Sequence, residues 1–251
     1  MSVGALKESM MATVEQLLAD ERIERLAPSE GIVLKDVPWA LYEALRDVEE
    51  NWHIKMTYDD GALELMSPSN KHESIKKRIG RLIETMTAEL HIPVRPLGST
   101  TWKADRSEKK GGLEADECCY ILNERFVREC EEIDLALAPP PDLAVEAEVS
   151  RRAVPKEPIY ARLGVPEVWR CDGKSLRSFQ LIAGEYVENE MSLNLPFLRV
   201  ADLMPFVKWR PGAGGSEWIQ EFQTWARSNF ADQIRTSRSA AAGGTPARNL
   251  L

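Results

Sequence analysis

Two carboxylates on one predicted strand mark the part of the sequence that could do chemistry. After the triple proline at 139–141, residues 143–149 alternate between core-type and other side chains, which predicts a β-strand. Glu146 and Glu148 lie on its second face, about 6–7 Å apart along the backbone. Because a core strand rarely carries two acids without a cation against them, the pattern indicates a divalent metal ion.

A second acidic strand is expected at residues 113–122, where Glu114 and Asp116 share one face. Neighbouring strands are about 4.8 Å apart, so Asp116 and Glu146 can approach one cation from two strands. Carboxylate oxygens and water are the ligands that Mg²⁺ prefers. Lys156 follows ten residues after Glu146 and could turn back toward the same site. Two acids and a lysine around a metal can activate a water molecule and stabilise negative charge on a phosphate.

Two other polar side chains receive structural interpretations. Asp142 and Glu146 are about 13 Å apart along one strand, too far to share an ion, so Asp142 is expected to accept hydrogen bonds at the strand's start. His72 is a candidate general base, but a lone histidine at a helix start more commonly caps or packs, and we expect that role.

The pattern around these residues predicts alternating strands and helices. A helix over residues 71–90 carries an apolar core stripe, formed by Ile75, Ile79, Leu82, Ile83, Met86 and Leu90. Lys77 and Arg81 should face solvent, on a basic surface that is either simply solvated or in contact with phosphate. Further strands are expected at 53–58, 62–66, 94–103, 167–171 and 176–182, with a short helix at 158–163.

The chain is expected to divide into four parts. These are an N-terminal extension with a helical pattern (1–35), a main domain (36–210), a C-terminal helix (211–233) and a disordered, Ser-, Ala- and Gly-rich tail (234–251).

Composition limits the classes of protein. The 251 residues are 43% hydrophobic and 29% charged, which is ordinary for a globular protein. No apolar run approaches about 18 residues, no secretory signal is evident, and four cysteines form no disulfide framework, so a cytoplasmic location is expected. The net charge of −8 argues against nucleic acid as a partner, but net charge alone does not exclude a local basic groove.

An ordered series of motifs resembles one known family. Residues 54–68 (IKMTYDDGALELMSP), followed by His72-Glu73, are similar to the opening of the Uma-type ("Uma two") restriction endonucleases. The resemblance continues over residues 36–205 with GSTT at 98–101, LEADECCYI at 113–121, DLAVE at 142–146 and KEPIYARLGVPEVW at 156–169. That family resembles the PD-(D/E)XK superfamily, which implies an α/β (α+β) fold with a mixed β-sheet flanked by helices and a Mg²⁺-dependent nuclease site.

The resemblance also implies roles for individual residues. Asp116 and Glu146 would hold Mg²⁺ or Mn²⁺, with the carbonyl of Ala147 as a further ligand. Lys156 would stabilise the transition state or orient the attacking water. Glu73 would correspond to an acid that the superfamily often carries on its first core helix.

The sequence departs from the family pattern after Glu146. Glu148 stands where the E-x-K signature has its lysine, so Lys156 is expected to replace that lysine. Glu148 would then either weaken phosphate binding or take part in the site as another ligand. The following loop is basic, and its Arg151 and Arg152 join two helical residues as candidate DNA contacts, Lys77 and Arg81.

The leading hypothesis is therefore a Mg²⁺-dependent endonuclease that hydrolyses phosphodiester bonds in DNA. The alternatives are a catalytically inactive nuclease-fold domain that binds nucleic acid or protein, and a hydrolase of a smaller phosphoester. No membrane partner is expected, and a homodimer is left open.

Overall fold

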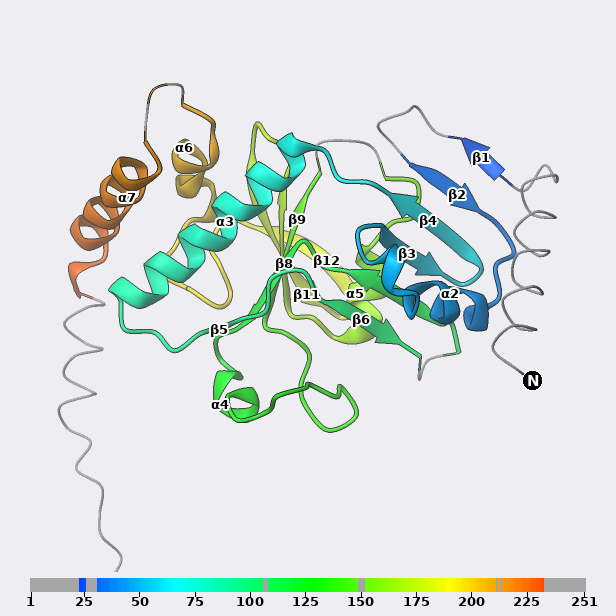
Figure 1. Ribbon diagram of the computed structural model, residues 1–251. Coiled ribbons are helices and arrows are strands. Elements are labelled where there is room, and N and C mark those ends of the chain that lie inside the picture. Colours follow the sequence, from blue (N-terminus) through cyan, green and yellow to red (C-terminus); the bar gives the residue numbers. More distant parts are fainter. Residues whose placement is uncertain are drawn as a thin grey trace, which may run out of the picture.

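The computed structural model describes the backbone of residues 23–25 and residues 31–105, 108–148, 152–210, 212 and 214–232. Within them, the strands form two six-stranded sheets (Figure 1). The first sheet has the order β1 (Ile23–Arg25), β2 (Ile32–Leu34), β4 (Ala62–Met66), β3 (Lys55–Asp59), β7 (Gly111–Glu114) and β6 (Thr101–Ala104). The second has the order β12 (Glu185–Asn189), β11 (Leu176–Ile182), β10 (Glu167–Cys171), β9 (Leu143–Ala147), β8 (Glu117–Tyr120) and β5 (Arg95–Pro96).

Helices flank these sheets. They are α2 (Trp39–Arg46), α3 (Asn70–Glu89), α4 (Glu124–Val127), α5 (Glu157–Leu163), α6 (Met204–Val207) and α7 (Gly215–Asn229), with 3₁₀ turns η1 (Glu49–Asn51) and η2 (Val200–Leu203). The expected α/β (α+β) class is confirmed, with two sheets in place of one. No helix in the described ranges has both the length and the apolar character needed to cross a membrane.

The start of the chain differs from the expected helical extension. Ile23, part of the helical pattern, lies in strand β1, which pairs with β2. Strand β2 in turn pairs with β4, so residues 32–34 belong to the first sheet. The remainder of the predicted extension, like the tail at 234–251, lies outside the described residues.

The predicted strand over 113–122 is divided between the two sheets. Its first part is β7 in the first sheet, and its second part is β8 in the second sheet. The predicted strand over 94–103 is divided in the same way into β5 and β6, with Gly98 at a φ of 61° between them. A left-handed φ favours glycine, and the Gly98 carbonyl accepts from Cys118 N at 3.1 Å. Both segments therefore pass from one sheet to the other at the same place, and Asp116 lies there.

Strand β9 is at the centre of the second sheet, antiparallel to β8 and parallel to β10. Helix α5 makes the crossover between the parallel strands and ends at Gly164, whose φ is 77°. The predicted alternation is confirmed, because Leu143, Val145 and Ala147 join one hydrophobic cluster and Ala144 joins another. Glu146 therefore points to the same face as Ala144, away from α3.

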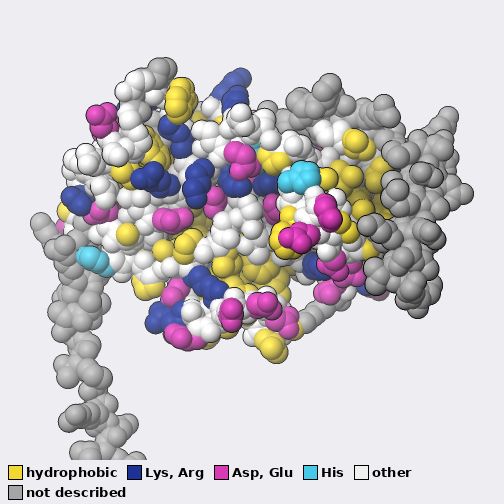
Figure 2. All heavy atoms as spheres, in the orientation of Figure 1, with side chains coloured by type: hydrophobic (Ala, Val, Ile, Leu, Met, Phe, Trp, Pro, Cys, Tyr) yellow, Lys and Arg dark blue, Asp and Glu magenta, His cyan; other side chains and the backbone are white. Residues whose placement is uncertain are grey.

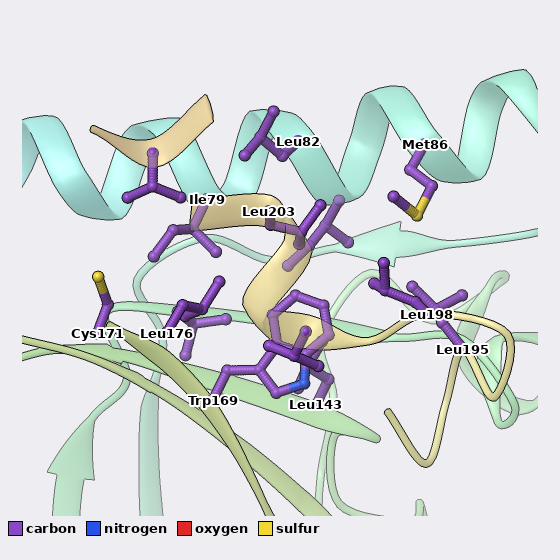
Figure 3. Close-up of a cluster of buried hydrophobic side chains, with 14 of the residues drawn as sticks. Ile79, Leu82, Met86, Leu143, Trp169, Cys171, Leu176, Leu195, Leu198 and Leu203 are labelled. Carbon is purple, nitrogen blue, oxygen red and sulfur yellow. The ribbon is translucent and has the colours of Figure 1, made fainter. Parts of the chain in front are cut away.

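Helix α3 covers the first of these two faces. Its N-cap Ser69 accepts a hydrogen bond from His72 N at 3.3 Å, and the predicted apolar stripe is buried. Figure 3 shows Ile79 and Leu82 pointing from α3 toward side chains of the sheet, Leu143 and Trp169 among them. Lys77 and Arg81 are exposed, as predicted.

Candidate active site

Asp116 lies where the chain passes between the sheets, and its side chain is fully buried. Lys55 of β3 donates to Oδ1. On the other oxygen, Ala147 N donates to Oδ2 at 2.8 Å. His72 Nε2 lies 3.0 Å from Oδ2 and Arg152 Nη2 lies 3.3 Å from it. One short carboxylate is thus held by groups from β3, α3, β9 and the loop before α5.

Glu146 is also buried and faces this group from β9. Lys156 Nζ lies 3.0 Å from each of its carboxylate oxygens, and Arg152 Nη2 lies 2.5 Å from Oε2. Tyr160 donates its hydroxyl to Oε1. Lys156 is the N-cap residue of α5 and also donates to the Glu114 carbonyl at 2.6 Å, which fixes the ammonium group from a second side.

The structure brings Asp116, Glu146 and Lys156 into one cluster. One nitrogen, Arg152 Nη2, contacts Asp116 Oδ2 and Glu146 Oε2 at the same time. The two carboxylates therefore converge on a single cationic position, as their predicted places on neighbouring strands suggest. Two chain segments far apart in sequence supply them, and α5 supplies the lysine.

The two carboxylates have different proton affinities. Burial opposes ionisation of Asp116, but Lys156, the His72 hydrogen bond and Arg152 outweigh it and hold its pKa well below the ordinary value. For Glu146, burial is the larger effect and raises the pKa, although Arg152 and Lys156 oppose it. Burial and the nearby Arg152 charge lower the pKa of Lys156. Neighbouring groups whose pKa values are pushed apart are typical of acid–base chemistry.

Other predicted residues lie outside this cluster. Glu148 is bound by Arg170 of β10 through two contacts of 2.8 Å. Glu73 is at the exposed rim, 3.2 Å from His72 Nδ1 and 3.0 Å from Lys76 Nζ. Asp142 accepts from Ile121 N at 2.7 Å, which confirms its expected role at the strand's start.

The basic candidates separate into different surroundings. Arg152 is not on the surface, because its side chain is 10% exposed and lies between the two carboxylates. Its neighbour Arg151 lies outside the described residues. Lys77 and Arg81 are on the exposed face of α3.

Three side chains of the cluster were missed or given another role from sequence. The His72 ring contacts Asp116, while its backbone N–H makes the expected contact with Ser69. The sequence gives a weak indication for Lys55, because a lysine on a strand that is otherwise buried requires an acidic partner. Tyr160 gave a stronger one, because it lies four residues after Lys156 and so shares its helix face.

The carboxylate oxygens of the cluster suit a hard divalent cation in donor type. Asp116 Oδ2 and Glu146 Oε2 already face one cationic nitrogen, and carboxylate oxygens suit Mg²⁺. Throughout the residues that the structure describes, no set of three or more His, Cys, Asp or Glu side chains is arranged to hold a metal. The chain would therefore supply two carboxylates, and water would complete the shell, as is usual for Mg²⁺.

Comparison with known proteins adds one relationship. A search of curated proteins gives no match. The family model Uma2, described as "Putative restriction endonuclease", matches residues 39–210, which is more than half of the chain and includes every residue of the cluster. The chain belongs to the Uma2 family.

Proposed function

We propose that this protein is a Mg²⁺-dependent endonuclease that hydrolyses phosphodiester bonds in DNA. The observation that carries the proposal is the convergence of Asp116 and Glu146 on one cationic position with Lys156 beside them. Membership of a family described as restriction endonucleases supports a nuclease.

Each residue of the cluster has a role in this reaction. Asp116 and Glu146 would hold the ion, and a bound ion would supply a water of lowered pKa and charge to offset the phosphate. Lys156 would place its ammonium group where negative charge develops as the new P–O bond forms and the old one breaks. His72 and the Ala147 amide fix the orientation of Asp116, so its lone pairs are directed before the substrate arrives.

Cleavage of plasmid DNA in Mg²⁺, abolished by a chelator, is the direct test. Asp116→Asn and Glu146→Gln should each reduce cleavage by at least about 10²–10³-fold, because each removes charge from the ion's position. Glu132→Gln, an exposed acid on the loop after α4, is the matched control and should cleave like wild type. Full activity in Asp116→Asn would overturn the proposal.

Lys156→Met tests the position of the catalytic charge. The change leaves an unbranched side chain one atom shorter than lysine and removes its charge, so cleavage should slow by about 10²–10³-fold. Circular dichroism should show an unchanged fold, because Arg152 and Tyr160 still contact Glu146. Unchanged cleavage would remove Lys156 from the mechanism.

One observation favours a second candidate, a nuclease-fold domain that binds DNA without cutting it. The carboxylates are already neutralised by Lys55, Arg152 and Lys156, and Glu148 stands where the signature has a lysine. DNA binding with no cleavage in Mg²⁺ or Mn²⁺ would select this candidate. Cleavage of a small phosphodiester but not of DNA would select a phosphoester hydrolase.

The cysteines are consistent with the expected cytoplasmic location, which remains part of the proposal. All four are free, and Cys118, Cys119 and Cys171 are buried. Free thiols are typical of proteins in reducing compartments.

A further inference from the structure

The basic residues of α3 are gathered near its N-terminus, the end of a helix where positive charge is unfavourable. Five basic residues lie in its first twelve positions, Lys71, Lys76, Lys77, Arg78 and Arg81, and its last turn carries no basic residue. A helix N-terminus has a partial positive charge and favours acids, whereas the C-terminus favours bases. Helix stability therefore does not account for this arrangement. Figure 2 shows Lys and Arg side chains gathered over α3.

Two of these five charges, Lys77 and Arg81, are available to a partner. Lys76 pairs with Glu73 at 3.0 Å. Lys77 and Arg81 are exposed, and neither forms an ion pair with any residue that the structure describes. Arg210 lies near enough to add to the effect of burial in lowering the pKa of Arg78, which shows that positive charges are crowded here.

An exposed tryptophan lies beside these charges. Trp209, on the segment after α6, is 71% exposed. The guanidinium of Arg78 lies 5.1 Å from its ring centroid, and Arg78 Nη1 also donates to the carbonyls of Phe206 and Lys208 at 3.3 and 3.1 Å. The arginine is thus fixed by the backbone and holds the indole, while most of the ring surface faces solvent.

The basic surface and the candidate active site share helix α3. His72 of the cluster and Arg78 are six residues apart on α3, about 9 Å along the helix axis. Arg81 lies about 14 Å from His72 by the same measure. His72 is on the buried face of α3 and Lys77 and Arg81 are on its exposed face, so a strand whose scissile phosphate is at the cluster would pass around the first turns of the helix to reach the basic face and Trp209.

We infer that Lys77, Arg81 and Trp209 bind a single-stranded segment of the nucleic acid, with phosphates on the two basic side chains and an unpaired base stacked on the indole. The inference rests on the proposed function and narrows its substrates to DNA with unpaired bases, such as overhangs, forks or gaps. Basic grooves with exposed aromatic rings are how proteins hold single strands. In an intact duplex, the faces of internal bases are stacked on each other and offer nothing to an indole.

The test measures binding in the presence of a chelator, so that it does not depend on cleavage. Fluorescence anisotropy of a labelled single-stranded oligonucleotide is compared for wild type, Trp209→Ala and Trp52→Ala. Trp52 is the matched control, since it is also an exposed tryptophan, 65% exposed, but lies at the end of η1. Loss of one stacked base should weaken binding by about 5- to 150-fold in Trp209→Ala and leave Trp52→Ala like wild type.

Salt dependence tests the phosphate contacts. The slope of log K against log salt concentration should fall by about 0.7 for each of Lys77→Gln and Arg81→Gln. Equal binding by wild type and Trp209→Ala, tighter binding of a blunt duplex than of a single strand, or no binding of DNA would each overturn the inference.

The outcomes distinguish failure of the nuclease proposal from failure of the binding surface. A wild-type protein that binds the single strand through Trp209 but cleaves nothing in Mg²⁺ or Mn²⁺ would overturn the nuclease proposal and support the binding surface. If the wild-type protein cleaves DNA and Trp209→Ala binds the single strand as tightly as wild type, the nuclease proposal is supported and the binding surface is overturned.

Discussion

At the centre of the site, one nitrogen of Arg152 contacts both Asp116 and Glu146. Two buried carboxylates this close would repel each other strongly in a medium of low dielectric constant. The Arg152 guanidinium, a group of the protein itself, offsets that repulsion. A bound metal ion and this guanidinium would therefore compete for the same oxygens.

Replacing Arg152 by Gln should have two opposite effects. The metal-free protein should lose about 3–5 kcal/mol of stability, because the two buried carboxylates lose the cation that they share. Its affinity for Mn²⁺ should rise, because the competing cation is gone. Urea denaturation in a chelator and calorimetric Mn²⁺ titration measure the two effects.

Arg170→Gln is the matched control for this change. Arg170 pairs with Glu148 and Glu157, is 28% exposed and contacts neither Asp116 nor Glu146, so its loss should cost about 1 kcal/mol and leave Mn²⁺ affinity unchanged. If Arg152→Gln bound Mn²⁺ no better than wild type, competition between arginine and metal would be excluded.

Glu117 provides a test of pH dependence at a single residue. Its side chain lies against Gly80 of α3, where an added Cβ would fall 2.9 Å from the Glu117 carboxyl carbon. Burial raises its pKa above the ordinary 4.5, although Lys76 and Lys77 oppose the shift. The folded protein therefore binds this proton more tightly than the unfolded chain, and the resulting stabilisation is lost as pH rises above 4.5.

Glu117→Gln should accordingly raise the melting temperature by a few degrees at neutral pH, with a gain that shrinks as pH falls toward 4.5. Thermal melts between acidic and neutral pH measure it, with Glu132→Gln as an exposed control. A variant less stable than wild type at pH 7 would mean that the Glu117 charge is well compensated.

Among the elements, α3 serves both the core and the site through its buried face. Its apolar stripe closes the core over β9, while its first turn places His72 in the cluster. The N-cap at Ser69 fixes where the helix begins, and so fixes His72 relative to Asp116. Packing of α3 and geometry of the site are therefore coupled.

Leu82→Ala measures how much the core depends on this packing. Leu82 is fully buried, so its truncation should cost about 2–5 kcal/mol. Lys77→Ala, on the exposed face of the same helix, should stay within about 0.5 kcal/mol of wild type. The denaturant midpoint is the readout, and equal midpoints for the two variants would mean that α3 contributes little to stability.

Elements with one clear period could be predicted from sequence, and the junction between the sheets could not. Strand β9 and helix α3 bury their side chains as their patterns indicate. The alternation that begins at Leu113 is interrupted at the adjacent acids Asp116 and Glu117, but this interruption does not reveal that the chain changes sheet. Only pairing with β3 on one side and β9 on the other divides that segment.

The same distinction applies to the site. Asp116, Glu146 and Lys156 could be predicted because two acids and a lysine on neighbouring elements are typical of a metal-dependent site that acts on phosphate. Lys55 and His72 lie 61 and 44 positions from Asp116 in sequence. Their contacts depend on tertiary packing, which no short motif encodes.

At the scale of the whole molecule, the site is charge-balanced without a metal. Lys55, Lys156 and Arg152 neutralise the buried carboxylates, so the fold should not depend on an ion. Chelation should cost at most about 2.7 kcal/mol, the linkage expected for an ion at 100 times its Kd. The protein should still unfold in one cooperative transition, as followed by calorimetry. Unfolding on addition of a chelator at room temperature would show instead that a metal is structural.

The residues of the cluster lie far apart in sequence, so they are synthesised at different times. Lys55, His72 and Asp116 are translated first, whereas Glu146, Lys156 and Tyr160 follow only with β9 and α5. A nascent chain stalled before residue 146 therefore carries one carboxylate among basic side chains and has no pair to share an ion. Under the proposed DNA-cutting function, incomplete chains would lack the site. The pair of carboxylates is complete only when strand β9 of the second sheet has been added.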